Sequence, residues 1–408
     1  MFPTRRQFLL QSATAAAISV ASASRADDRA KFAPFDKLMT SFLAEHEVPG
    51  GSLAVSRNGS LVYSRGFGLA NVDKKRPVEA DSLFRIASIS KPITAAAVLQ
   101  LVDANKVKLD ELVLNYIRLK PHLAAGAKVD PRWYLITVRH CLQHTGGWDR
   151  DKSGDPIGMT RQIAAALGTK PAAEPEDVVR FAMGRSLDFD PGTRFAYSNL
   201  GYLLLGRVIE TATGRGYEEY VKQEVLAPLR ITRMQLGRAL PEHRAKGEVN
   251  YYDSRNSTGE CLYLPRIGER VPYPDGAANV EGYEAHGGWI ASAADLVKFA
   301  CAFDVPALCP ILSRAAIQTM WERPSGGFAW DAKTWYGCGW SVRPQVENRV
   351  TTWHNGLISG TSTLLVRRSD GWNWAALFNT ERNPAGKFPS NLIDPLLHNA
   401  VNEVIAAS

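Results

Sequence analysis

The sequence has few cysteines and no pair of them at metal-binding spacing. Five cysteines occur among 408 residues, and none of them form a Cys-x-x-Cys pair. The sequence therefore gives no indication of a structural zinc site. Basic residues form no run of five or six despite a formal net charge of +7, which argues against a nucleic-acid partner. Internal repeats are also missing. What remains is a globular composition, 45% hydrophobic and 22% charged, with enough residues for one large or two interleaved domains.

The N-terminus has the pattern of an export signal. Thr4-Arg5-Arg6-Gln7-Phe8-Leu9-Leu10 is a twin-arginine pattern, and an alanine-rich run over 13–23 follows it. Small residues around Ala23 and Ala26 offer cleavage sites, and the apolar run is shorter than the ~20 residues that span a bilayer. We therefore expect residues 1–26 to be a twin-arginine signal peptide. The mature protein would be periplasmic or secreted, with no stable membrane span.

Export would place the cysteines in an oxidising compartment. Cys301 and Cys309 flank a short loop and could form a disulfide, while the odd count leaves at least one thiol free. Cys141 lies in an apolar helical pattern, so we expect it in the core.

The stretch 84–92 carries a serine and a lysine three residues apart. If Ser88 opens a helix, Lys91 lies one turn later on the same face, and an amine beside a hydroxyl can activate it as a nucleophile. Residues 94–102 are almost wholly apolar, which predicts a helix buried on nearly all sides. Taken alone, the pair is more commonly an N-capping serine and a solvated lysine. Motifs elsewhere in the chain must decide between a catalytic serine–lysine pair and this structural alternative.

Both ends of the chain predict strands, and the middle predicts helices. An amphipathic helix begins at 35 and is ended by Gly50-Gly51, and Asn58-Gly59 is the turn signal of a hairpin between strands over 52–56 and 61–70. Further strands are predicted over 336–342, 350–353, 361–366 and 372–379. Helices are predicted over 137–147, 198–212, 217–226, 291–303 and 395–405, with a long irregular excursion over 241–283.

This order predicts an α/β fold with a sheet domain and an all-helical part made by one chain. We expect the domain to cover 35–405, with its α/β part at about 35–85 and 285–405 and its helical part at about 86–284. A cleft between the two parts would be the natural ligand site.

Tyr197-Ser198-Asn199 precedes the long apolar helix and can assist Ser88. A phenol near a lysine loses its proton more easily, so Tyr197 could be base in acylation and acid towards the leaving group. Asn199 could orient Lys91 and a substrate carbonyl. The alternative is a core tyrosine followed by an N-capping residue.

His354-Asn355-Gly356 lies between two strand-like runs. Gly356 would keep the approach to the strand open, and the N–H groups of Ser88 and Leu357 would form an oxyanion hole. Two other segments, at 144–146 and 286–288, also match His-x-Gly. His286-Gly287-Gly288 resembles a lipase oxyanion loop, but the chain lacks the Gly-x-Ser-x-Gly elbow of that fold, so we interpret it as a turn before a helix.

Together these motifs resemble the serine β-lactamase and penicillin-binding protein superfamily, particularly its class C-related branch of β-lactamases, D-peptidases and esterases. The resemblance extends from about residue 35 to the end, and other matching stretches are Phe84-Arg85-Ile86-Ala87-Ser88, Leu142-Gln143-His144-Thr145-Gly146-Gly147 and Tyr336-Gly337-Cys338-Gly339-Trp340. It implies a β-lactamase/transpeptidase-like fold, an antiparallel sheet flanked by helices with the active site beside a helical subdomain. It also implies that Ser88 forms an acyl-enzyme with help from Lys91 and Tyr197, without a metal or organic cofactor.

One departure from the family pattern bears on the substrate. His354 stands where classical β-lactamases carry the lysine of Lys-Thr-Gly, and a histidine is mostly neutral at pH 7. Leu357 is also bulkier than the residue expected there. We therefore expect the substrate to be a small molecule or a peptide. A small ester or amide is favoured over a β-lactam. A β-lactamase or D-alanyl-D-alanine carboxypeptidase, or a slowly acylating sensor domain, are the alternatives. Trp148 and Trp289 follow glycine pairs and are expected to wall the cleft.

Overall fold

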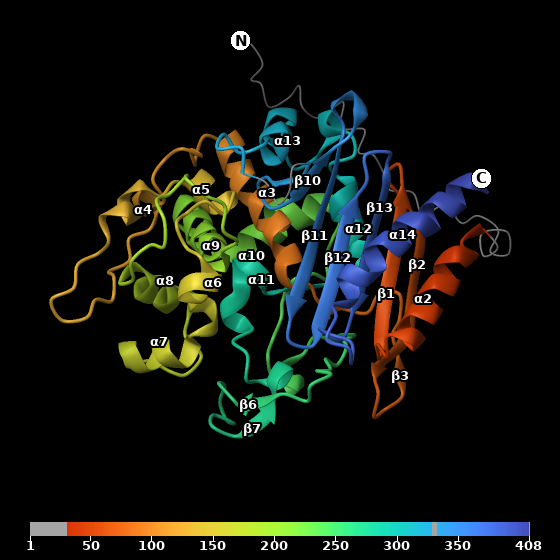
Figure 1. The fold of residues 1–408 in the computed structure, drawn as a ribbon, viewed down its shortest axis with the longest axis horizontal. Coiled ribbons are helices and arrows are strands. Elements are labelled where there is room, and N and C mark those ends of the chain that lie inside the picture. The colour runs from red at the N-terminus through yellow and green to blue at the C-terminus, as the bar shows by residue number, and fades with distance from the viewer. Residues whose placement is uncertain (1–30, 329–332, 408) are drawn as a thin grey trace, which may run out of the picture.

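A computed structural model describes residues 31–328 and 333–407, so the predicted signal peptide lies outside the described residues (Figure 1). Eight strands form one antiparallel sheet in the order β3-β2-β1-β13-β12-β11-β10-β9. Its N-terminal strands are β1 (Gly50–Arg57), β2 (Ser60–Asn71) and β3 (Arg76–Pro77). Its C-terminal strands are β9 (Trp335–Tyr336), β10 (Ser341–Pro344), β11 (Val350–Ile358), β12 (Thr361–Arg367) and β13 (Trp372–Phe378). The two ends of the chain meet where β1 pairs with β13.

Helices cover both faces of this sheet. The helices α2 (Ala33–Glu45) and α14 (Pro389–Ala406) lie side by side on one face, and α12 (Ala293–Cys301) packs on the other (Figure 1). Side chains along a strand alternate between faces. On β13, Trp374 and Ala376 accordingly join the core under α2 and α14, whereas Ala375 and Leu377 join the core on the α12 side.

The segment between the two groups of sheet strands is mainly helical. Its helices are α3 (Ser90–Asp103), α4 (Val113–Tyr116), α5 (Val138–Leu142), α6 (Arg150–Ser153), α7 (Thr160–Leu167), α8 (Pro175–Met183), α9 (Asn199–Thr213), α10 (Tyr217–Tyr220), α11 (Glu284–Gly287) and α13 (Arg314–Trp321). The apolar helices α3 and α9 pack together at its centre (Figure 1). Ser198 caps the start of α9 and Gly214, at φ 69°, ends it.

Short strands complete the middle of the chain. β4 (Phe84–Arg85), β8 (Trp289–Ala291) and β5 (Gln235–Leu236) form a three-stranded sheet, and β6 (Thr258–Glu260) pairs with β7 (Arg270–Pro272). The buried guanidinium of Arg85 donates hydrogen bonds to the carbonyls of Arg238, Ala239 and Pro274. This arginine therefore ties the predicted irregular excursion to β4.

The hairpin signal is confirmed, but the predicted helix end is wrong. Asn58 and Gly59 adopt φ of 50° and 80° between β1 and β2. In contrast, α2 ends at Glu45, and Gly50 and Gly51 begin β1. A Cβ atom on Gly50 would lie 2.5 Å from the Leu69 carbonyl oxygen, so the glycine permits close strand packing instead of ending a helix.

The proposed disulfide is also wrong, because Cys301 and Cys309 are both free thiols. The sulfur of Cys301 lies 3.0 Å from the Ser56 hydroxyl, on the sheet side of α12, whereas Cys309 belongs to the following loop. Cys141 is 1% exposed, as predicted for a core residue. None of the helices within 31–328 and 333–407 has both the length and the apolar character needed to cross a membrane.

Candidate active site

Ser88 occupies a tight turn at the entrance to a buried helix. It lies in a 3₁₀ turn, Ala87–Ile89, that leads directly into α3. From Ser82 to Leu99 it is the only residue that is not buried. Its neighbour Ala87 has φ of 48°, a left-handed conformation that is uncommon for a residue with a Cβ atom. The chain thus turns sharply here and presents one hydroxyl to solvent.

Long-range contacts hold this turn between two sheets. On one side, the Ile86 N–H donates to the Trp289 carbonyl at 2.9 Å, which extends the pairing of β4 with β8. On the other, the Thr363 hydroxyl of β12 donates to the Ile86 carbonyl at 3.0 Å. A Cβ atom on Gly356 would lie 2.2 Å from that same oxygen, so β11 can approach only because residue 356 is glycine.

Lys91 is buried beside Ser88 and does not point into solvent. Its Nζ lies 3.0 Å from Ser88 Oγ, 2.8 Å from Asn199 Oδ1 and 2.8 Å from the His286 carbonyl oxygen. The side chain is 0% exposed, which rules out the alternative of a solvated lysine. Burial lowers the pKa of Lys91 well below its usual value, because the charged form loses its hydration.

Asn199 connects Lys91 to a carboxylate that the sequence analysis did not single out. While Asn199 Oδ1 faces Lys91, its Nδ2 donates to Asp155 Oδ2 at 2.7 Å. Because a carboxylate only accepts and an amine N–H donates, these neighbours fix the orientation of the amide. The negative charge of Asp155 raises the pKa of Lys91 and partly offsets the effect of burial.

Tyr197 lies against both reactive side chains. Lys91 Nζ lies 4.9 Å from the centre of its ring, and the phenol is near enough to the Ser88 hydroxyl for that group to lower its pKa. Burial raises the pKa of the phenol above its usual value, and the effects of Ser88 and the Arg150 charge offset this only in part. The prediction that Lys91 makes the phenol lose its proton more easily is therefore wrong. Ser88, Lys91, Tyr197 and Asn199, predicted from two separate motifs, therefore converge.

His354 is close to this group but bonds elsewhere. Its Nε2 accepts from the Tyr336 hydroxyl at 3.0 Å, and its Nδ1 donates to the Asn355 carbonyl. Its ring lies 6.4 Å from that of Tyr197, with His144 and Tyr336 in the same cluster of rings. Burial, and the neighbouring Lys91, lower the pKa of His354 to about 3. Both ring nitrogens of His354 are therefore engaged, one with the Tyr336 hydroxyl and the other with the Asn355 carbonyl.

Leu357 lies on the part of β11 that faces the turn. β10 pairs with β11 only as far as Trp353, so residues 354–358 extend beyond it beside the Ser88 turn. The side chain of Leu357 is half-buried. This placement suits the predicted oxyanion role of its N–H group.

The structure corrects two predictions near the glycine pairs. Trp289 is 0% exposed, and its indole N–H donates to the Tyr217 hydroxyl, so it belongs to the core and not to a cleft wall. Trp148 is half-buried and packs against Trp133. His286 lies in α11 just before strand β8, not in a turn before a helix, and its carbonyl contacts Lys91.

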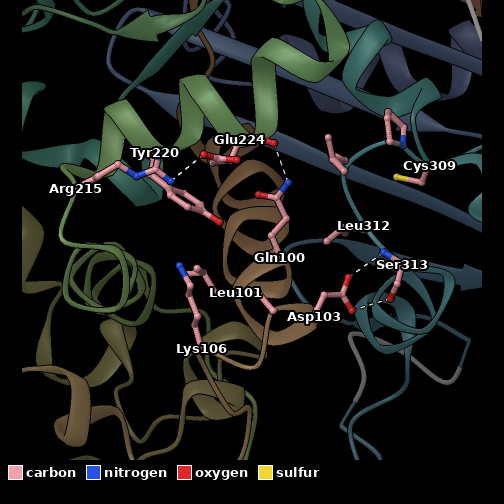
Figure 2. A pocket seen from close by; sticks show the side chains of 13 residues that line it. Gln100, Leu101, Asp103, Lys106, Arg215, Tyr220, Glu224, Cys309, Leu312 and Ser313 are labelled. Atoms are coloured by element: carbon pink, nitrogen blue, oxygen red, sulfur yellow. Dashed lines mark hydrogen bonds and ion pairs between the residues drawn. The ribbon is translucent and has the colours of Figure 1, made fainter. Parts of the chain in front are cut away.

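A separate cavity lies at the opposite end of α3. The cavity has a volume of about 440 Å³. Gln100, Asp103, Arg215 and Cys309 are among its lining residues (Figure 2). Since Ser88 precedes the first residue of α3 and the cavity borders its last turn, the two sites are distinct. Over the part of the chain that the structure describes, no three His, Cys, Asp or Glu residues are grouped to hold a metal ion.

The comparisons with known proteins identify the family of the chain. The model of the beta-lactamase family matches residues 35–393. The chain belongs to the beta-lactamase family. A penicillin-binding protein of Bacillus subtilis (strain 168) is 28% identical over 80% of this chain and 67% of its own. Esterase EstB of Burkholderia gladioli is 33% identical over 60% of this chain and 59% of its own length.

Solved structures of a penicillin-binding protein homologue and of an amidase share the fold. A penicillin-binding protein homologue from Pyrococcus abyssi aligns with a TM-score of 0.67 and 26% identity, covering 90% of this chain and 77% of that one. The D-amino acid amidase from Ochrobactrum anthropi SV3 also gives 0.67, at 22% identity, covering 93% and 99%. The predicted family, fold class and enzyme class, a serine hydrolase, are thereby confirmed.

Proposed function

We propose that this beta-lactamase family member hydrolyses a small ester or amide through an acyl-enzyme on Ser88. The observation that carries the proposal is the environment of Lys91. Its Nζ has three oxygen neighbours, of which two, the Asn199 amide and the His286 carbonyl, can only accept hydrogen bonds.

A neutral amine can donate one hydrogen bond to each of these two acceptors and keep its lone pair free to accept a proton. Its two N–H groups donate to Asn199 and His286, and its lone pair faces the Ser88 hydroxyl. Ser88 O–H then donates to Nζ, and the proton passes to Lys91 as Oγ attacks the substrate carbonyl carbon. The lowered pKa of Lys91 makes the neutral state accessible.

Tyr197 completes the proton path in this proposal. Through its contact with Ser88, the phenol can give its own proton to the leaving group and recover the proton that Lys91 took from Ser88. The N–H groups of Ser88 and Leu357 would stabilise the oxyanion. Water activated by the same groups would release the acyl-enzyme.

The state of His354 favours esters and simple amides over β-lactams. A histidine with a pKa of about 3 stays neutral at pH 7, so it offers no permanent charge to the carboxylate of a β-lactam. The similarity to esterase EstB supports an ester substrate. We further propose that the twin-arginine signal exports the enzyme to the periplasm or beyond the cell.

Labelling of the nucleophile tests the proposal. The chain is expressed with its 26-residue leader removed and treated with a fluorophosphonate probe, with Ser88→Ala as the control. Wild type should label and the variant should not, since the phosphonate ester forms on Oγ. The kcat/KM values for a series of p-nitrophenyl esters are then compared with that for nitrocefin. The best ester should have a kcat/KM at least tenfold higher than that of nitrocefin. Equal labelling of both proteins would refute Ser88 as nucleophile, and faster nitrocefin turnover would reverse the substrate order.

A further inference from the structure

The cavity at the C-terminal end of α3 has the walls and the size of a binding site. Its walls are the last turn of α3, the helix α10 with the π-helix Val221–Leu226 that follows it, and the loop before α13 (Figure 2). π-Helices are rare and occur frequently at functional sites. The volume of about 440 Å³ lies within the range of roughly 300–1,000 Å³ that is usual for small-ligand sites.

Two polar groups of this cavity have no hydrogen-bond partner in the described parts of the chain. The amide oxygen of Gln100 is buried and unpaired, while its Nε2 donates to the Glu224 carbonyl at 2.8 Å, which fixes the orientation of the amide. Tyr220 is 5% exposed, and no described residue forms a hydrogen bond with its hydroxyl. The two side chains extend into the cavity from opposite walls, α3 and α10 (Figure 2). Since buried polar groups are nearly always paired, both are suited to bind a ligand.

The chemistry of this pair selects a hydroxyl group. The Gln100 oxygen can only accept a hydrogen bond, whereas the Tyr220 phenol can donate one or accept one. A ligand hydroxyl can donate to the amide oxygen and accept from the phenol at the same time. A carboxylate has no proton to give to Gln100, and an ammonium group leaves the phenol proton of Tyr220 without an acceptor.

The charges around the cavity favour a neutral ligand. Two cations and two carboxylates line it, so their charges cancel. Arg215 forms an ion pair with Glu224 at 2.9 Å. The two carboxylate oxygens of Asp103 accept from Ser313, one from its N–H at 2.9 Å and the other from its hydroxyl at 2.7 Å. Lys106 is exposed, and its ammonium can donate to further hydroxyl groups of a ligand.

We propose that this cavity binds a neutral molecule with several hydroxyl groups, of the chemical class of mono- and disaccharides. Its hydroxyls would bond to the amide oxygen, the phenol and the ammonium just described. The C–H face of a sugar ring would lie on the buried side chains of Leu101 and Leu312, which also line the cavity. The site does not depend on the proposed function, because Ser88 precedes the other end of α3. A sugar bound here would therefore leave the Ser88 site free.

Titration of the mature chain with sugars of different charge tests this proposal. Glucose, N-acetylglucosamine and cellobiose are the neutral probes, and glucuronate and glucosamine are the charged counterparts of glucose. Dissociation constants are measured by saturation-transfer NMR. At least one neutral sugar should bind saturably, and glucose should bind at least threefold more tightly than either charged counterpart. Tyr220→Phe removes only the hydroxyl and should weaken binding at least threefold. Ala104→Trp places an indole at an exposed lining position and should abolish binding.

Matched controls locate the bound sugar. Tyr134→Phe removes the hydroxyl of a tyrosine that is 55% exposed and lies outside the cavity, and it should leave the dissociation constant unchanged. Cys309 lines the cavity, so a saturating neutral sugar should slow its alkylation by iodoacetamide at least twofold, as followed by mass spectrometry of its peptide. Fluorophosphonate labelling of Ser88 should keep its rate in the presence of the sugar.

Three results would overturn the proposal. If no neutral probe binds saturably, water alone satisfies the two polar groups. If a charged counterpart binds more tightly than glucose, the ligand is not a neutral sugar. If binding is unchanged in both Tyr220→Phe and Ala104→Trp, the sugar binds elsewhere. Whether the wild-type chain labels with fluorophosphonate decides the proposed function separately, so the two failures are distinguishable.

Discussion

The proton affinity of Lys91 is balanced between two opposing effects. Burial disfavours its charged form, while the carboxylate of Asp155, reached through Asn199, favours it. A lysine without such a carboxylate would lose its proton still more readily. Asp155 therefore both orients the Asn199 amide and raises the pKa of Lys91.

Replacing Asp155 by asparagine separates these two roles. Asp155→Asn keeps an oxygen acceptor for Asn199 Nδ2 but removes the negative charge, so the pKa of Lys91 should fall further. Since Lys91 must be neutral to accept the Ser88 proton, the acid limb of the kcat/KM profile for a neutral ester should move to lower pH. The profile is measured beside Asp151→Asn, an exposed acid on the preceding helix α6. An acid limb that stays in place, or moves to higher pH, would contradict the role of Asp155.

Sequence reasoning reached the residues that stand in short motifs and missed those that do not. Ser88 and Lys91 are three positions apart, and a helical turn alone brings them together. Asp155 and the His286 carbonyl reach Lys91 only through the folding of distant segments. A backbone carbonyl also has no signature in side-chain identity, which is why the segment around His286 was interpreted as a simple turn.

At the level of elements, the site depends on how closely β11 approaches the turn before α3. Gly356→Ala would place a methyl group 2.2 Å from the Ile86 carbonyl oxygen and 3.1 Å from the Ala87 Cβ atom. The backbone must then move, so the turn and the strand separate. We expect labelling of Ser88 to slow at least tenfold and stability to fall by about 1–3 kcal/mol, the usual cost of overpacking.

A second glycine provides the control for this substitution. Gly216 has no atom within 4 Å of an added Cβ and lies before α10, away from the turn. Gly216→Ala should keep both the labelling rate and the midpoint of thermal unfolding. If Gly356→Ala labels as fast as wild type, the close approach of β11 is not needed for the reactivity of Ser88.

Elements with local signals were predicted well, and those defined by distant partners were not. Asn58-Gly59 fixes its hairpin by turn chemistry, and Ser198 with Gly214 delimits α9 by capping. The prediction for Gly50 was wrong. A glycine can either end a helix or allow a neighbouring strand to approach closely, and only the position of Leu69 in the fold shows that the second case applies. Likewise, Trp289 follows two glycines, a pattern typical of a loop. It instead begins strand β8, which pairs with β4 on one side and with β5 on the other.

On the scale of the whole molecule, buried histidines and buried carboxyl groups change the pH dependence of stability with opposite signs. His144, His286 and His354 are at most 4% exposed, and burial lowers the pKa of each. An unfolded chain binds protons at these histidines first, near pH 6.5, so their contribution to stability is lost as the pH falls below that value. Glu284 and Asp304 have pKa values raised to about 7 and about 6 by burial. They bind protons first in the folded chain, so acidification stabilises it through them.

Two substitutions should therefore change the pH dependence of stability with opposite signs. The free energy of unfolding is measured by urea titration from pH 4.5 to 6.5. His354→Gln removes a group that the unfolded chain protonates and the folded chain does not, so the rise of stability with pH should become shallower, by up to about 1.4 kcal/mol per pH unit. Glu284→Gln removes a group of the reverse kind, so the rise should become steeper. Slopes that match wild type in both variants would mean that neither group titrates differently in the folded and unfolded chains, and slopes that change with the same sign would show that burial does not govern their protonation.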